Sequence, residues 1–325
     1  MERPSPPDTL WFTRCPVPTA TGVAADLGWL AAEFRADGIA VRSLQDVPPG
    51  EAGDRHYTHA LPGLVREGGS VPALWARSRG ADTRLLGLTW IEERQAVLTR
   101  RGETGLRLGA ARLAVPRRDI AIDFWRAMAL AGFAGALALE GAALDDAKTV
   151  EVEAAPDAPQ WAAELAALER GEVDAVYVKG ALAVEAALAH GAEVAVDLDA
   201  VPDRRSRVNN GTPRPITVHR RLLEDHPDLV ARFLAVLLRA ADWAAGNPGG
   251  LRRVLSAETG AGAAAVARAY RPQPLHPDLS DERLDLLAAQ ERFLRARGFL
   301  DAPVDVREWA DRGPLDAALA AEAAR

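Results

Sequence analysis

Three side chains in the N-terminal part of the chain could together do chemistry on a small anion. Cys15 is the only cysteine among 325 residues, so it cannot form a disulfide within the chain. A thiol becomes a nucleophile when a histidine, a cation or a helix N-terminus lowers its pKa, and His56 could share its proton. The Arg66 guanidinium can bind an oxyanion with two parallel hydrogen bonds. Gly68 and Gly69 allow close backbone approach and N–H donation to a developing negative charge. These residue types predict a Cys–His–Arg site.

An inert role for Cys15 stays open at this point, because an isolated cysteine is often a small buried hydrophobic residue. The sequence separations of Cys15, His56 and Arg66 permit contact between their side chains but do not establish it. His59 is expected to be a loop histidine and not a second catalytic one.

The elements around Cys15 would display its thiol at the end of a strand. Leu10-Trp11-Phe12 is a short apolar run that predicts a strand. Pro16 and Pro18 end strand pairing, because proline donates no ladder hydrogen bond. A helix is predicted to begin near Ala20, and its first N–H groups could face the site. Since open α/β sheets bind ligands at strand ends, this turn is a suitable place for a site.

Strands and helices alternate through roughly the first 200 residues, which predicts an α/β fold with a mostly parallel sheet. The helix from Ala20 is expected to run to about Asp37, and Ile39–Leu44 alternates like a strand. From Arg221 onward the chain is predicted to be helical. Other predicted strands are Thr83–Trp90, Val150–Glu153, Ala175–Val178 and Ile216–His219, and other predicted helices are Asp123–Leu139 and Ala181–His190.

Two α/β lobes followed by a return into helices is the outline of a bilobal venus-flytrap fold, in which the ligand lies between the lobes. We expect residues 8–104 to form the first part of lobe 1 and residues 105–210 to form lobe 2. Residues 211–325 would return to lobe 1, mostly as helices.

Composition narrows the classes of partner. The net charge of −7 argues against nucleic acid or an anionic membrane surface. No run of about 18 apolar residues predicts a membrane-spanning helix. A single cysteine excludes a cysteine-rich zinc site, and we expect no metal. The first nine residues show no secretory signal pattern, so we expect a cytoplasmic protein.

One set of motifs carries a resemblance to a known family. The chain has Cys15-Pro16-Val17-Pro18, then His56-Tyr57-Thr58, then Arg66 just before Gly68-Gly69. This set resembles the 2'-hydroxybiphenyl-2-sulfinate desulfinase family. That family is built on the type II periplasmic-binding-protein fold, which substrate-binding proteins for taurine, nitrate and thiamine-precursor uptake share. The resemblance continues in the same order through the stretches 84–89, 171–177 and 196–198.

The resemblance implies a role for each residue. Cys15 would be the nucleophile or the proton donor, and His56 would be its acid/base or orienting partner. Arg66 would bind the sulfinate, and the Gly69 backbone would help to stabilise its oxygens. The reaction would release sulfite and leave a C–H bond on the product, with no metal and no organic cofactor.

One stretch departs from that family. After Tyr177 the desulfinases have a tryptophan-rich segment, whereas this chain has Val178-Lys179-Gly180. A lysine in place of an aromatic wall predicts a smaller or more anionic ligand than a biphenyl. We expect the ligand to contact Gly68, Gly69, Lys179, Gly180 and Asn210.

Two functions follow. The first is a desulfinase-like enzyme that cleaves the C–S bond of an organic sulfinate. The second is a non-catalytic binding protein for a sulfonate-like or other small organic anion, which would deliver it to an ABC permease. A binding protein has no need of a thiol and a histidine beside its arginine, so we rank the enzyme first.

Overall fold

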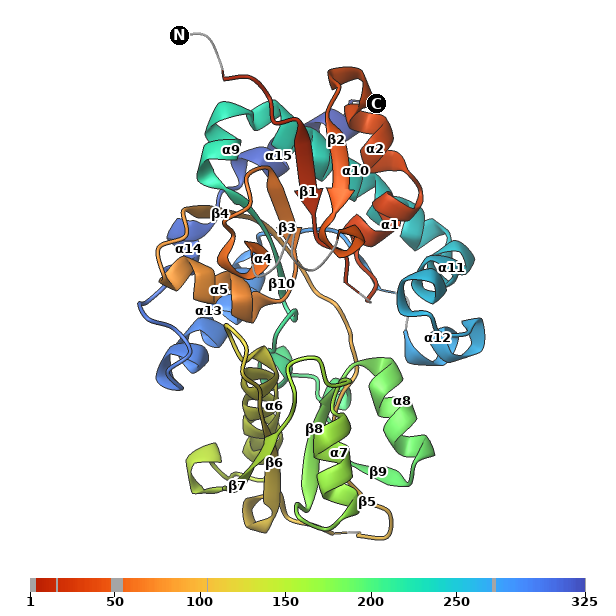
Figure 1. Ribbon diagram of the computed structural model, residues 1–325, viewed down its shortest axis with the longest axis vertical. Helices are drawn as coiled ribbons and strands as arrows, with labels where there is room; N and C mark the ends of the chain where they lie inside the picture. The colour runs from red at the N-terminus through yellow and green to blue at the C-terminus, as the bar shows by residue number, and fades with distance from the viewer. Residues whose placement is uncertain (1–3, 16, 48–54, 104, 271–272, 325) are drawn as a thin grey trace. The chain divides into compact units, whose positions relative to one another are not determined.

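Two α/β units, each with its own five-stranded sheet, make up the part of the chain that the computed structural model describes (Figure 1). The described residues are 4–15, 17–47, 55–103, 105–270 and 273–324, without the side chain of His56. Unit 1 draws on residues 1–91, 211–267 and 271–325. Unit 2 draws on residues 92–210 and 268–270.

The sheet of unit 1 has the strand order β2-β1-β3-β10-β4. Parallel pairing joins β1 to β2 and β3, whereas β10 runs antiparallel to β3 and β4. The carboxyl ends of β1, β3 and β4 therefore share one edge with the amino end of β10. We call this edge, with residues 13–15, 67–69, 89 and 214, the site edge. The strands are β1 (Thr9–Phe12), β2 (Ala40–Ser43), β3 (Leu64–Glu67), β4 (Thr83–Thr89) and β10 (Arg214–His219).

Helices cover this sheet, and the longest of them is α10 (Pro227–Gly246), which begins with proline at its first turn. Its apolar side chains recur at helical spacing, so it buries one face, and it packs against α1, α2 and α15. No helix among the described residues is both long and apolar enough to cross a bilayer. The other helices are α1 (Ala20–Asp26), α2 (Trp29–Phe34), α4 (Arg55–Thr58), α5 (Ser70–Ser78), α9 (Arg220–Asp225), α11 (Pro248–Thr259), α12 (Ala263–Ala269), α13 (Asp281–Ala296), α14 (Val306–Trp309) and α15 (Gly313–Ala323).

The sheet of unit 2 has the order β7-β6-β8-β5-β9. Its central strand β8 is buried at every residue, and Tyr177 on it packs edge-on against Trp161, with ring centroids 5.5 Å apart. β6 is parallel to β7 and β8, while β5 is antiparallel to β8 and β9. The elements are β5 (Gln95–Arg100), β6 (Arg112–Arg117), β7 (Lys148–Glu153), β8 (Ala175–Lys179), β9 (Ala192–Asp197), α6 (Phe124–Leu139), α7 (Ala162–Glu169) and α8 (Ala181–Ala189).

One expectation about these elements is wrong and another is confirmed. The single helix predicted from Ala20 to about Asp37 is divided into α1 and α2, because Gly28 between them adopts a left-handed conformation with φ of 70°. The expected mostly parallel arrangement is confirmed in both described sheets. Four strands of each sheet run in one direction, and the fifth, β10 in unit 1 and β5 in unit 2, is antiparallel to its neighbours. An alternating apolar pattern in the sequence predicts a strand, but it does not predict whether that strand runs parallel or antiparallel to its neighbours in the sheet.

The division of the chain also differs from the lobe boundary predicted at residue 104. Residues 92–104 lie in unit 2, because β5 pairs with β8 and β9 there. The chain re-enters unit 1 at Gly211, just before β10.

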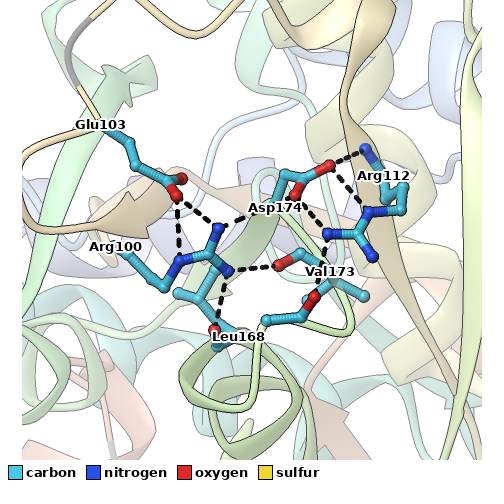
Figure 2. Close-up of polar contacts among 7 residues, drawn as sticks. Arg100, Glu103, Arg112, Leu168, Val173 and Asp174 are labelled. Carbon is cyan, nitrogen blue, oxygen red and sulfur yellow. Dashed lines mark hydrogen bonds and ion pairs between the residues drawn. The ribbon is translucent and has the colours of Figure 1, made fainter.

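A cluster of charged side chains ties together the starts of β6 and β8 in unit 2, as Figure 2 shows. Arg112 binds the Asp174 carboxylate through Nη2 at 2.6 Å and Nε at 3.0 Å, and its backbone N–H donates to the same group at 2.8 Å. Arg100 pairs with Glu103 and donates to the Leu168 and Val173 carbonyl oxygens. Hydrogen bonding from Arg112 lowers the pKa of Asp174.

We predict that Asp174→Asn lowers the free energy of unfolding at pH 7 by about 2 kcal/mol, since charge-assisted hydrogen bonds of this kind are worth roughly that much. A carboxyl with a lowered folded-state pKa stabilises the protein above its ordinary pKa and loses that contribution as the pH falls. The difference between wild type and variant should therefore shrink below about pH 4. Urea titrations across this pH range measure it.

Glu153→Gln is the matched control. Its carboxylate pairs with Arg117 at 2.8 Å, but these side chains are 70% and 60% exposed. Exposed pairs contribute about 0.5 kcal/mol, so this variant should be nearly neutral at every pH. Equal effects of the two substitutions would contradict a stabilising role for the cluster.

Candidate functional site

Cys15 lies at the site edge, in the turn that follows β1. Its side chain is half-buried. Two groups contact its sulfur: the Arg214 Nη1, which donates to Sγ at 3.2 Å, and the Glu67 carbonyl oxygen, which lies 3.9 Å from Sγ. One partner comes from β10 and the other from β3, so the turn is fixed against the centre of the sheet.

The buried Glu67 carboxylate connects the elements around the site edge through hydrogen bonds. It is 1% exposed and accepts hydrogen bonds from the Thr21 backbone N–H at 3.2 Å, the Thr21 hydroxyl at 2.5 Å and the Thr89 hydroxyl at 3.0 Å. Its backbone carbonyl accepts from the Thr13 hydroxyl at 2.8 Å. Because a buried carboxylate needs several donors, these contacts connect β3 with α1, β4 and the end of β1.

This arrangement corrects one expectation. From the sequence, the first N–H groups of the helix at Ala20 could face the site near Cys15. The Thr21 N–H instead donates to Glu67, and the Gly22 N–H donates to the Thr19 hydroxyl at 3.0 Å. The chain's own side chains thus satisfy these donors.

Arg66 supplies a buried cation at the same edge. The residue is 3% exposed, and its Nη1 donates to the Gly69 carbonyl oxygen at 3.0 Å. Burial lowers the pKa of the guanidinium to about 10, the Arg214 cation acts in the same direction, and Cys15 acts in the opposite one. With a pKa of about 10, Arg66 remains charged at neutral pH.

Gly68 is required by the way Arg66 folds back along the chain. A Cβ atom at residue 68 would lie 2.7 Å from the Arg66 Cζ and 2.8 Å from each of its terminal nitrogens. Only a residue without a side chain fits under the guanidinium. Gly69 follows as the residue that caps the N-terminus of α5.

Arg214 is the site residue that sequence reasoning missed. It is 4% exposed and begins β10, and its pairing with Thr89 of β4 brings it to the site edge. The polar, turn-rich stretch before β10 gave no sign of it. Only the antiparallel insertion of β10 between β3 and β4 places it beside Cys15, 199 residues away in sequence.

The predicted histidine cannot be placed in the same way. The backbone of His56 belongs to α4, and its side chain lies outside the described residues. His59 is 2% exposed and shares a hydrogen bond of 2.8 Å with the Thr217 hydroxyl. Burial and the Arg66 cation lower the pKa of His59 to about 3, so its ring is neutral at physiological pH. Thr217 is the register partner of Arg66, which puts both side chains on one face of the sheet.

The other predicted ligand contacts belong to unit 2. The Lys179 ammonium is 2% exposed and forms an ion pair of 2.6 Å with Glu93. Gly180 caps α8 with a φ of 115°, and its N–H donates to the Arg94 carbonyl oxygen at 3.0 Å. The Asn210 N–H donates to the side chain of Asn209 at 2.8 Å. Contact of these residues with a ligand stays a prediction.

The site edge is thus suited to anion chemistry. It carries a half-buried thiol and two buried guanidinium groups beside a glycine-containing turn. A guanidinium binds sulfinate, sulfonate or carboxylate oxygens, and a thiol can attack or donate a proton. In the described part of the chain, no three His, Cys, Asp or Glu side chains gather as a metal site would require.

Comparison with solved structures identifies the fold. The periplasmic aliphatic sulphonate binding protein SsuA of Escherichia coli matches 94% of this chain and 92% of its own, with a TM-score of 0.68 at 16% identity. A family model described as NMT1/THI5 like matches residues 131–250. The predicted fold class is confirmed: the chain has two α/β lobes of the type II periplasmic-binding-protein kind.

A more specific similarity is to desulfinases. The chain is 29% identical to the 2'-hydroxybiphenyl-2-sulfinate desulfinase of Rhodococcus erythropolis over 93% of this chain and 91% of that protein. A cysteine-to-serine variant of DszB in complex with biphenyl-2-sulfinic acid has a TM-score of 0.74 at 26% identity, and the match covers 96% of this chain and 99% of that one. The resemblance carried by the sequence motifs is therefore confirmed along nearly the whole chain.

We predict that Gly68→Ala weakens binding of small anions at the site edge by about ten-fold, because a methyl group 2.7 Å from Cζ must displace the Arg66 guanidinium. Isothermal titration with benzenesulfinate and benzenesulfonate measures the effect. Gly246→Ala is the control, since a Cβ there meets nothing within 4 Å. Unchanged affinity in Gly68→Ala would mean that Arg66 does not bind the anion in its present position.

We predict that Lys179→Met lowers the free energy of unfolding by about 3 kcal/mol, because it leaves the Glu93 carboxylate without its buried cation. Lys179→Met combined with Glu93→Leu should recover part of that loss, and the coupling in a double-mutant cycle measures the pair. A Lys179→Met variant as stable as wild type, with weaker anion binding, would instead support the predicted ligand contact.

Proposed function

We propose that this protein is a desulfinase-like hydrolase that cleaves the C–S bond of an organic sulfinate. In the proposed reaction a sulfinate and one water molecule give a hydrocarbon and hydrogen sulfite. The carbon–sulfur bond breaks, the carbon gains a proton, and the sulfur gains the water oxygen. No electrons are exchanged with a cofactor, so the reaction as proposed needs only water and the side chains of the site.

One observation carries the proposal: the only thiol of the chain and a buried guanidinium meet at one sheet edge, next to Gly68 and Gly69. Arg66 would bind the sulfinate oxygens, because its planar fork matches two oxygens on one sulfur. Cys15 would act on the sulfur or donate the proton to carbon. His56 would serve as its acid/base or orienting partner.

The similarity to a desulfinase along nearly the whole chain supports the same chemistry. The solved complex of the cysteine-to-serine DszB variant with biphenyl-2-sulfinic acid supports a sulfinate as the ligand class. We propose a smaller or more anionic sulfinate than a biphenyl, since Val178-Lys179-Gly180 offers no aromatic wall after Tyr177.

A second candidate function is non-catalytic binding of a sulfonate-like anion for an ABC uptake system. The fold shared with the aliphatic sulphonate binding protein favours it. Under that function Arg66 would bind the ligand in the same way, and Cys15 would have no chemical role. A permease would then be the partner.

We predict that wild-type protein releases sulfite from at least one member of a panel of aryl and alkyl sulfinates. Cys15→Ser should lower sulfite release by about 1000-fold, because serine is a far weaker nucleophile and acid. It should keep ligand affinity, since it preserves the size of the side chain. Arg66→Ala should lose about 100-fold in affinity and lose turnover, because a buried cation partner is worth roughly 3 kcal/mol to an anion.

Arg66→Lys is the matched control for charge without the planar fork, and it should fall between wild type and Arg66→Ala. Cys15→Ser with normal turnover would rule out the proposed chemistry. Absence of sulfite with every sulfinate, together with a rise in melting temperature on adding sulfinates or sulfonates, would favour the binding protein.

A further inference from the structure

The Cys15 sulfur has one charged partner at hydrogen-bond distance among the described residues. Arg214 Nη1 donates to Sγ at 3.2 Å, well within the range for a bond to sulfur, whereas the Glu67 carbonyl lies 3.9 Å away. Arg214 is 4% exposed, so water screens its charge only weakly. A buried guanidinium at this distance can hold the sulfur in place and stabilise negative charge that develops on it.

Other charges near Cys15 have partners that hold them in place. Arg66 donates to the Gly69 carbonyl, and the Glu67 carboxylate receives donors from Thr21 and Thr89. Arg14, next to Cys15 in sequence, forms ion pairs with Asp46 at 3.4 Å and Glu258 at 3.3 Å. Arg66 also interacts with Cys15 through its charge. Among the described residues, Arg214 is the charged group whose donor lies at hydrogen-bond distance from the sulfur.

We infer that Arg214 is a positioning residue of the candidate site: it orients the Cys15 side chain and stabilises its thiolate. This inference rests on the proposed role of Cys15. It adds Arg214 to the residues of the candidate site. Arg214 lies on β10, after the chain has re-entered unit 1, and is far in sequence from the motifs that contain Cys15, His56 and Arg66. Arg66 would remain the group that binds the anion, and Arg214 would act through the sulfur.

The single cysteine makes the test direct, because any thiol alkylation by iodoacetamide occurs at Cys15 and peptide mass spectrometry can follow that residue alone. Alkylation requires the thiolate, so its rate as a function of pH reports thiolate formation without any turnover. We expect Arg214→Gln to slow alkylation at pH 7 by about ten-fold, because the sulfur loses its charged donor. Arg214→Lys, which keeps the charge and loses the fork, should slow it less.

Arg118→Gln is the matched control. Arg118 is also 4% exposed, but it lies in unit 2, where it donates to the Ala158 carbonyl oxygen and stacks over Trp125. Its loss should lower the melting temperature and leave the alkylation profile of Cys15 unchanged. That outcome separates a local effect on the sulfur from a general loss of stability.

A folded Arg214→Gln variant whose alkylation profile coincides with that of wild type would overturn the inference. If Arg214→Gln does not fold, Arg214→Lys decides: slower alkylation supports the inference and an unchanged rate refutes it. Sulfite release by wild type is a separate measurement. Slower alkylation without any sulfite release would refute the proposed hydrolase and leave the role of Arg214 intact.

Discussion

The buried carboxylate of Glu67 is the constraint on which the rest of the site edge depends. It is almost completely buried, so hydrogen-bond donors must surround its carboxylate, and those donors come from α1 and β4. Its own backbone carbonyl contacts Thr13 and the Cys15 sulfur. One side chain and its peptide group thereby fix the thiol relative to the strand that also carries Arg66.

The position of Arg66 depends on the same strand. It precedes Glu67 in β3, and successive side chains of a strand point to opposite faces. Glu67 therefore serves the face that binds α1, while Arg66 shares its face with Thr217, to which His59 is bonded. A neutral His59 beside the guanidinium adds no competing charge. Among the described residues, the buried arginines Arg66 and Arg214 place positive charge at this edge.

Much of this could be predicted from the sequence, and the limits are physical. The apolar run at Leu10 and the prolines after Cys15 located the turn, because proline removes a donor that a strand needs. Arg214 and the antiparallel entry of β10 could not be found, because long-range pairing leaves no local pattern. The sequence motifs also do not predict that the Thr21 N–H donates to Glu67 or that Lys179 forms an ion pair with Glu93. Those contacts depend on which side chains meet after folding.

The solitary nature of Cys15 has a consequence for oxidation. Peroxide converts an accessible thiolate to a sulfenic acid, which many proteins rescue by forming a disulfide with a second cysteine. This chain has no second cysteine, so a sulfenic acid at Cys15 can be reduced only by a thiol from outside the chain. The next oxidation product, a cysteine sulfinic acid, would set an anion of the substrate's own chemical type directly against Arg214. Oxidised protein would then carry a permanently attached mimic of its proposed ligand.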